Sequence, residues 1–178
     1  MLLTKGPGTG KTTVVVDILL KILRESRGDR PKILMTASTH NGMIPYVLYT
    51  IIILIEIAVD NVLERFVKLN QPENLVPEQE ILRVATDVSK VNEDLREYTI
   101  DARVGGDLNE NNKLAKKARE RVKAACLVFT TCAGAGLGTL RKFDFDIAII
   151  DEASQITEPT ALIPLVKGVR QAVLVGDQ

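Results

Sequence analysis

The sequence predicts an α/β fold, in which helices cover both faces of a parallel β-sheet. Two observations support this. Several short segments are continuous apolar runs, and amphipathic helical patterns separate them along the chain. Such runs are typical of strands in a parallel sheet, because the helices that connect the strands bury both faces. With 178 residues, the chain is long enough to form one domain with its own core.

The expected strands are short and lie along the whole chain, at 2–4, 32–37, 125–130, 146–150 and 172–175. A helix is expected over 12–24, where apolar residues recur on one side. A second helix is predicted by one apolar stripe at helical spacing, formed by Ile81, Val84, Val88, Val91 and Leu95. A third follows a loop at 109–112, with Leu114, Ala118 and Val122 on one face. We therefore expect residues 73–124 to form a helical excursion from the sheet.

Composition restricts the class of protein. The 23 basic and 23 acidic residues balance, so any case for nucleic-acid binding must come from local sites. Two cysteines are too few for a disulfide framework and favour a reducing compartment, cytoplasmic or nuclear. No signal peptide is expected. The uncharged run at 42–55 is shorter than the roughly 18 residues of a spanning helix, so no membrane partner is expected. No stable homo-oligomer is predicted.

A glycine-rich segment between the first strand and the first helix predicts a phosphate-binding loop. Its glycines let backbone N–H groups point inward, and the helix N-terminus adds a partial positive charge. Lys11 can reach the β- and γ-phosphates of a nucleotide, and the Thr12 hydroxyl can coordinate Mg²⁺. The alternative is a glycine-rich turn that caps a helix. The expected nucleotide-binding residues are Gly6, Pro7, Gly8, Thr9, Gly10, Lys11, Thr12 and Thr13.

Two acidic residues, Asp151 and Glu152, follow the buried run at 146–150. A carboxylate at the carboxyl end of a parallel strand faces the crevice where ligands bind in open α/β sheets. Asp151 is expected to hold Mg²⁺, which prefers oxygen ligands, and Glu152 to orient or deprotonate the attacking water. The alternative is an acidic helix start, with Asp151 as N-cap.

Five segments, in the same order along the chain, together resemble the motifs of superfamily 1 helicases, specifically the senataxin-like branch that includes the nonsense-mediated-decay helicase. Residues 6–12 resemble motif I, and 37–40 resemble the start of motif Ia. Residues 130–136 resemble the segment that this family places against the nucleic-acid backbone. Residues 151–155 are similar to motif II, in which Gln155 is the most telling residue, and 174–177 resemble the start of motif III.

The resemblance implies a RecA-like P-loop domain of an ATP-driven motor, which needs ATP and Mg²⁺ and moves 5′ to 3′ on single-stranded RNA or DNA. It implies that Gln155 senses the γ-phosphate and that Asp177 couples the nucleotide site to the strand. It also implies that Ser38, Thr39, Thr130 and Thr131 contact the nucleic-acid backbone, where such contacts fix position without reading sequence. For the threonines, the alternative is simple β-propensity at strand ends.

The sequence departs from the family pattern in three respects. Lys5 stands where the first loop glycine is usual, which puts nucleotide affinity in doubt. The apolar segment 41–57 intervenes where family members pass directly into a helix like 58–65, and we interpret it as an insertion. The family's second RecA-like domain, with its catalytic arginines, is expected to be absent, so the chain alone should bind ATP but hydrolyse it negligibly. A non-catalytic nucleotide-binding remnant and a P-loop enzyme of another class are the alternative functions.

Basic residues also cluster on the expected helix after the 109–112 loop. They are Lys113, Lys116, Lys117, Arg119, Arg121 and Lys123. Such a cluster could line a nucleic-acid channel. We favour a solvated face opposite the Leu114 stripe, because charge runs are usually solvent-exposed. A histidine-based zinc site is excluded, because His40 is the only histidine.

Overall fold

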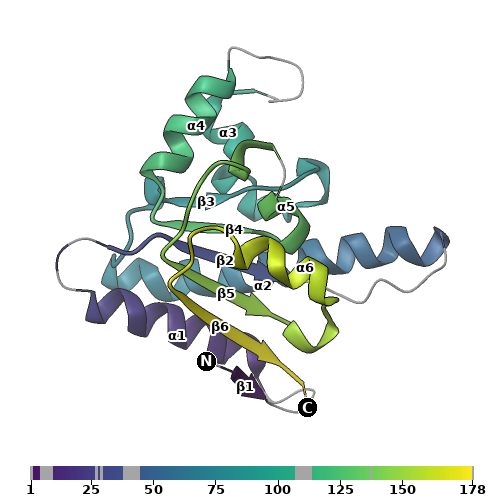
Figure 1. Ribbon diagram of the computed structural model, residues 1–178. Coiled ribbons are helices and arrows are strands. Elements are labelled where there is room, and N and C mark those ends of the chain that lie inside the picture. The colour runs from purple at the N-terminus through teal and green to yellow at the C-terminus, as the bar shows by residue number, and fades with distance from the viewer. Residues whose placement is uncertain are drawn as a thin grey trace.

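The computed structural model describes residues 2–4, 10–26, 28, 30–37, 45–106, 114–136 and 138–177, except for the side chains of residues 2 and 45–53. Within this part of the chain, six strands form one parallel sheet in the order β1-β6-β5-β2-β4-β3 (Figure 1). The strands are β1 (Leu2–Thr4), β2 (Ile33–Ala37), β3 (Ile81–Arg83), β4 (Leu127–Thr131), β5 (Ile147–Asp151) and β6 (Gln171–Gly176). The predicted α/β fold and its five expected strands are confirmed.

Helices cover both faces of the sheet, because successive side chains of a strand point to opposite sides. Ile33 and Met35 of β2 pack on one side with α1 (Lys11–Glu25) and α2 (Pro45–Glu73). Leu34 packs on the other side with residues of the opposite layer. That layer contains α3 (Ile100–Val104), α4 (Leu114–Ala124), α5 (Cys132–Gly136) and α6 (Glu158–Leu165) (Figure 1).

The helix predicted from the stripe between Ile81 and Leu95 is wrong. Ile81–Arg83 is instead the edge strand β3, which pairs in parallel with β4. Ile81 enters one core cluster and Leu82 the other, which is the period of a strand and not of a helix. Part of the predicted helical excursion, 73–124, therefore belongs to the sheet.

Local capping explains why no long helix forms after β3. The Asp87 side chain accepts a hydrogen bond from the Ser89 N–H, and this begins the short 3₁₀ helix Val88–Lys90. Asn92 caps a second one, Glu93–Tyr98, in the same way. Short polar side chains that bond the backbone two residues ahead compete with helix propagation. The apolar residues Val91, Leu95 and Tyr98 are still buried, but they reach the core from these short turns.

A buried charge cluster joins α2 to β3. Arg83 is fully buried and donates to Asp60 Oδ1 over 2.8 Å, to Glu56 and to the Val84 carbonyl. Asp60 Oδ2 accepts a further hydrogen bond from the Asn92 N–H, over 2.8 Å. Buried charges are tolerated when they are paired and hydrogen-bonded in this way. The cluster therefore holds the long helix, the edge strand and the turn at Asn92 together.

If residues 41–57 are an insertion, it ends at residue 57, inside α2. The helix continues across that position without a break. Residues 41–44 lie outside the described part of the chain, and Glu56, within the proposed insertion, takes part in the buried cluster. That 41–57 is an insertion stays a prediction, although its last turn is packed as part of the fold. Among the described helices, none combines the length and the apolar character needed to cross a membrane.

Arg83→Met should destabilise the fold by about 3–5 kcal/mol, because the substitution leaves the buried carboxylates of Glu56 and Asp60 without their cation. Urea unfolding measures the loss. Arg24→Met is the matched control, since Arg24 pairs with Glu73 in an exposed ion pair. That pair should contribute no more than about 1 kcal/mol. Equal losses in the two variants would contradict the structural role of the buried cluster.

Candidate active site

The carboxyl ends of the strands meet at one edge of the sheet, because all strands run in the same direction. The register places Thr4 at the end of β1 opposite Gly176 of β6, and Asp151 at the end of β5 opposite Ala37 of β2. Thr4, the last residue of β1, therefore lies beside the end of β6, and β5 is the next strand of the sheet. This edge collects the residues on which the sequence predictions depend.

Lys11, the first residue of α1, lies between two carboxylates from other elements. Its Nζ is 2.5 Å from Asp177 Oδ1 and 3.3 Å from Glu152 Oε2. The hydrogen bond with Asp177 raises the pKa of Lys11, burial opposes this, and Glu152 adds to the rise. The ammonium is therefore held in its charged form. Residues 166 positions apart in the chain are thus brought into direct contact.

Asp151 is the buried acid of the site, with 3% of its surface exposed. Its Oδ1 accepts a hydrogen bond from the Glu152 N–H over 3.0 Å. Burial raises the pKa of Asp151 to about 6; the Glu152 amide and Lys11 lower it, and the carboxylates of Glu152 and Asp177 raise it further. Asp151 is therefore a carboxyl group whose negative charge is only partly compensated by its surroundings.

Backbone geometry turns Glu152 toward Lys11. Glu152 has φ 54° and ψ 37°, in the left-handed region that side-chain-bearing residues rarely adopt. The chain thus turns sharply at the end of β5 and continues into the 3₁₀ helix Ala153–Gln155. This conformation costs about 1–2 kcal/mol, which the surrounding structure must supply. In return, two consecutive carboxylates reach the same site from different directions.

Ser154 and Gly176 position Asp177, although neither was predicted as a site residue. The Ser154 Oγ accepts a hydrogen bond from the Asp177 N–H over 3.0 Å. A Cβ atom at Gly176 would lie 2.7 Å from the Ser154 backbone nitrogen, so a residue with a side chain would push the two segments apart. In the sequence, the only signs of this contact are the serine within 151–155 and the glycine directly before Asp177. Their meaning depends on a contact between segments that are distant in sequence.

The remaining predicted nucleotide-site residues are only partly placed. Gly10 is the exposed N-cap of α1, with φ 79°, and Thr12 and Thr13 are half-exposed in its first turn. Gln155 lies next to Glu152, and its backbone N–H donates to the Glu152 carbonyl. The predicted loop residues Gly6, Pro7, Gly8 and Thr9 lie outside the described part of the chain.

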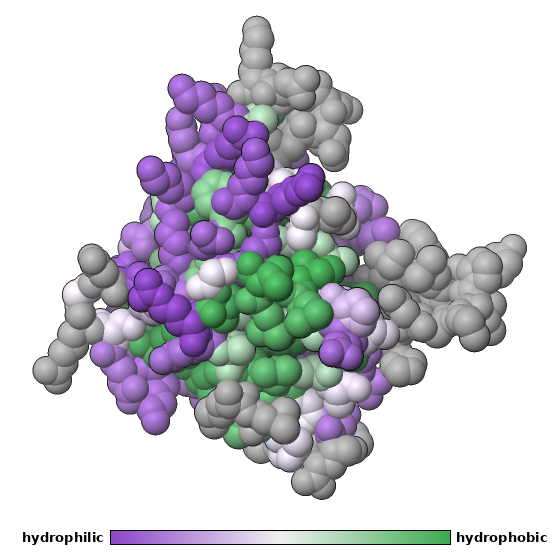
Figure 2. Space-filling model, in the orientation of Figure 1, coloured by the Kyte–Doolittle hydropathy of each residue, from purple (hydrophilic) through white to green (hydrophobic). Residues whose placement is uncertain are grey.

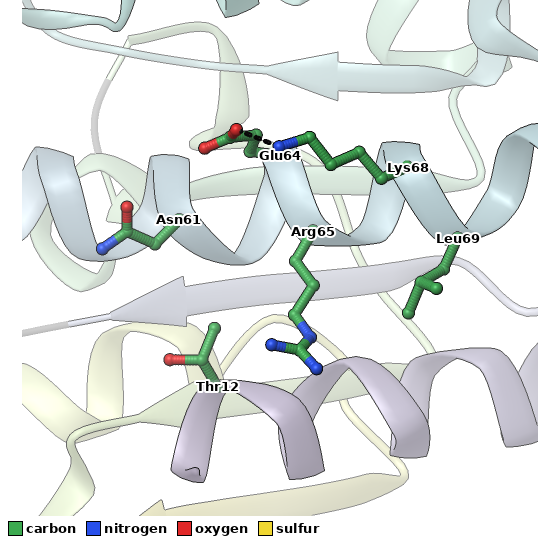
Figure 3. A pocket seen from close by; sticks show the side chains of 6 residues that line it. All are labelled: Thr12, Asn61, Glu64, Arg65, Lys68 and Leu69. Atoms are coloured by element: carbon green, nitrogen blue, oxygen red, sulfur yellow. Dashed lines mark hydrogen bonds and ion pairs between the residues drawn. The ribbon is translucent and has the colours of Figure 1, made fainter. Parts of the chain in front are cut away.

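An open groove of about 500 Å³ lies beside Thr12, between the first turn of α1 and the exposed side of α2 (Figure 3). From α2 it is lined by Asn61, Glu64, Arg65, Lys68 and Leu69. Glu64 and Lys68 pair with each other, whereas Arg65 extends toward α1 (Figure 3). No pattern in the sequence links α2 to Thr12, so this groove could not be predicted.

The donor set at this edge suits a hard cation. In the described part of the chain, no three acidic, histidine or cysteine side chains form a complete metal site. Mg²⁺ usually takes only one or two protein oxygens and completes its shell with phosphates and water. The buried carboxylate of Asp151 and a hydroxyl in the first turn of α1 meet that requirement, so the residues present fit Mg²⁺ with a phosphate ligand.

The four predicted nucleic-acid contacts have different outcomes. Thr130 is fully buried, and its Oγ1 has no hydrogen-bond partner among the described residues, so its contact with a nucleic-acid backbone stays a prediction. It lies in the sheet interior, where β-propensity explains its presence. Thr131, the last residue of β4, is half-exposed, and its Oγ1 accepts a hydrogen bond from the Gly134 N–H over 3.0 Å. Ser38 and Thr39 lie outside the described residues.

Comparison with known proteins finds several helicases to which the chain is similar. A family model described as an AAA domain matches residues 109–178. The DNA replication ATP-dependent helicase/nuclease DNA2 of Saccharomyces cerevisiae is 33% identical over 173 residues, which are 96% of this chain and 9% of that protein. The ATP-dependent helicase upf1 of Schizosaccharomyces pombe is 43% identical over 81 residues, or 39% of this chain and 9% of that protein.

A Regulator of nonsense transcripts 1 homolog of Arabidopsis thaliana is 49% identical over 67 residues, which are 36% of this chain and 5% of that protein. The chain thus spans only a small part, 9% or less, of each of these three relatives. The similarity to DNA2 covers nearly the whole chain, including the strands that carry the candidate site.

Asp151→Asn should stabilise the fold at pH 7.5 in buffer without Mg²⁺. The folded-state pKa of about 6 lies above the ordinary value of 3.8, so the folded state holds the Asp151 proton more tightly than the unfolded state. Wild-type stability therefore falls as the pH rises from about 4 to 6, by about 2–3 kcal/mol from this group. Urea unfolding should show that the advantage of the variant disappears below pH 4. A constant difference across this range would contradict the titration.

Proposed function

We propose that this chain, whose parallel α/β sheet fits a RecA-like P-loop domain, is an ATP-binding motor domain of a superfamily 1 helicase. In this proposal the domain couples ATP hydrolysis to movement on single-stranded RNA or DNA. The observation that carries it is the meeting of Lys11 with Glu152 and Asp177, from the ends of β5 and β6. This geometry supports the nucleotide site that the sequence predicted.

Lys11 would bind the β- and γ-phosphates of ATP. Its ammonium is charged, and a triphosphate offers it more negative charge than the two carboxylates it now contacts. The N-terminus of α1, which begins at Lys11, adds backbone N–H groups that favour an anion at the same place. Gly6 to Gly10 would complete the phosphate loop, as the sequence predicts, and Thr13 would belong to the same turn.

Asp151 and Thr12 would hold Mg²⁺. The ion would neutralise part of the phosphate charge, and it would favour the ionised form of Asp151, whose burial otherwise disfavours it. We expect the cation to lower the pKa of Asp151. Binding of ATP and of Mg²⁺ would then support each other, since each supplies charge that the other needs.

Glu152, Gln155 and Asp177 would act around the γ-phosphate. Glu152 reaches into the site from its left-handed turn and is 29% exposed at the side chain, so water has access to it. It would orient or deprotonate the attacking water. Gln155 follows in the same short turn and would sense the γ-phosphate. Asp177 would change partners when Lys11 binds phosphate, and this exchange supports the role of Asp177 in coupling.

The nucleic-acid partner would meet the same edge of the sheet. Thr131 at the end of β4 is half-exposed and is retained as a proposed backbone contact, together with Ser38 and Thr39 after β2.

The two described thiols, Cys126 and Cys132, are buried and form no disulfide, and burial raises the pKa of each to about 11. Unreactive, reduced thiols support a cytoplasmic or nuclear setting.

The sequence left two alternative functions open, a P-loop enzyme of another class and a non-catalytic nucleotide-binding remnant. A P-loop enzyme of another class is not favoured, because the similarity to the helicase DNA2 extends over 96% of the chain. A non-catalytic remnant would keep Lys11 and Asp151 but would not turn over ATP. Nucleotide binding and turnover must therefore be measured separately.

Lys11→Ala should weaken binding of a fluorescent ATP analogue at least tenfold, because it removes the cation that meets the phosphates. Fluorescence titration in Mg²⁺ measures the change. Lys21→Ala is the control, since Lys21 is an exposed lysine of the same helix, 73% accessible at its side chain. Binding that is unchanged by Lys11→Ala, or is weakened equally by Lys21→Ala, would refute the proposed site.

Glu152→Gln should lower ATP turnover by about 100-fold or more, because proton transfer by a positioned side chain contributes about 10²–10⁴ to rate. The affinity for ATP should change only a few-fold, since the amide keeps the shape of the side chain. Phosphate release with and without single-stranded RNA measures turnover. Low turnover by the wild-type chain alone is expected from the sequence, so phosphate release that is equal in wild type and Glu152→Gln would contradict the role proposed for Glu152.

A further inference from the structure

We propose that a cationic groove between α4 and the segment 138–143 binds a single-stranded nucleic acid through its phosphates. This inference rests on the proposed function only for the existence of a nucleic-acid partner. It concerns a surface distinct from the nucleotide site and from the contacts predicted at residues 38, 39 and 131. The groove has a volume of about 400 Å³, and Arg119, Gly138, Thr139, Arg141, Lys142 and Phe143 line it with Ala115.

The groove is lined by two segments that are separate in the sequence. Arg119 comes from α4, whereas Arg141 and Lys142 come from the segment after α5. All three residues are exposed, and the charged groups of their side chains form no ion pair with another described residue. Among the described residues that line the groove, none is acidic. Three positive charges that line one hollow surface, without an ion-pair partner among the described residues, are complementary to a polyanion.

The segment that carries Arg141 and Lys142 is fixed to the core by a buried side chain and by hydrogen bonds to its backbone. Leu140 is fully buried in the core, and the 3₁₀ helix Gly138–Leu140 packs against α4. The Nζ of Lys167, itself only 6% exposed, donates to the carbonyls of Leu140 and Arg141 over 2.7 and 2.8 Å. A backbone held by a core side chain and two charge-assisted hydrogen bonds presents its cations in a defined place, so little ordering is needed on binding.

Phe143 favours a nucleic acid over other polyanions. Its ring is half-buried and lines the groove with the three cations. Proteins that bind single strands combine a positive groove with aromatic rings on which bases stack. An acidic polypeptide would use the cations but has no base to stack on Phe143. The combination of positive charge with a half-buried aromatic ring in the groove lining therefore indicates a single-stranded nucleic acid as the occupant.

Most of the basic cluster on α4 takes no part in the groove. Lys116, Lys117, Arg121 and Lys123 are exposed outside it, as expected for a solvated face, and Lys113 lies outside the described residues. Figure 2 shows hydrophilic side chains over α4. These four residues therefore form the solvated face that the charge run predicted. Arg119 differs from them because it lines a groove together with residues 138–143.

The double variant Arg119→Ala/Arg141→Ala tests the groove. Fluorescence anisotropy with a labelled 20-nucleotide oligo(U) should show binding at least tenfold weaker, because two phosphate contacts are lost. The slope of log K against log salt should fall by about 1.4, since each phosphate contact on a single strand contributes about 0.7. Arg121→Ala, an exposed arginine of the same helix outside the groove, should bind within twofold of wild type. Equal losses in both variants, or none in the double variant, would overturn the proposal.

Phe143→Leu distinguishes a nucleic acid from an acidic polypeptide. The substitution keeps an apolar side chain, and thermal unfolding checks that the fold is retained. Oligo(U) affinity should fall about five- to tenfold with an unchanged salt slope, since stacking is lost and the charges remain. Polyglutamate should compete poorly for the groove. Effective competition by polyglutamate, together with full oligo(U) affinity of Phe143→Leu, would overturn the assignment in favour of an acidic polypeptide.

The failure of this inference can be separated from the failure of the proposed function. The groove variants should keep wild-type affinity for the fluorescent ATP analogue, because none of the substituted residues lies near Lys11. Lys11→Ala should conversely keep its oligo(U) affinity in nucleotide-free buffer. Loss of ATP binding in the groove variants would contradict the separation of the two sites. Unaltered ATP binding in Lys11→Ala would refute the nucleotide site and leave the groove standing.

Discussion

The contact of one ammonium with carboxylates from two neighbouring strand ends is the interaction on which the site depends. Lys11 meets Glu152 and Asp177 only because β1, β6 and β5 are adjacent and parallel, so that their carboxyl ends share one edge. A shift in register of even one strand would separate these groups, because neighbouring residues along a strand are about 3.3 Å apart. The sheet therefore sets the electrostatics of the site through its pairing.

Buried charged side chains are paired around Arg83 but only partly paired at the candidate site. Around Arg83, nearly every charged atom has a partner, and the cluster is sealed from solvent. At the candidate site, Asp151 is buried but has only the Glu152 amide as a hydrogen-bond donor among the described residues, and the carboxylates of Glu152 and Asp177 remain accessible to solvent. Satisfied buried charges hold elements together, whereas an uncompensated carboxylate disposes a site to bind a cation.

The helix predicted from Ile81 to Leu95 does not form, for two physical reasons. The stripe from Ile81 to Leu95 has helical spacing, yet its first residues form a strand because β4 offers a partner for Ile81–Arg83. Side chains of Asp87 and Asn92 then begin separate short turns. A strand partner outside the segment therefore decided the start of the stripe, and local capping decided the rest.

Local patterns were sufficient for the α/β class, five strands, the helix after the glycine-rich segment and the choice of Lys11, Asp151 and Glu152. Apolar runs, helical spacing and motif chemistry are all written within short stretches of chain. The edge strand β3, the link from Ser154 to Asp177, the groove beside Thr12 and the meeting of Arg119 with Arg141 emerged from the folded chain. These features require contacts between segments far apart in sequence, and which segments meet is settled by strand order and by the packing of helices on the sheet.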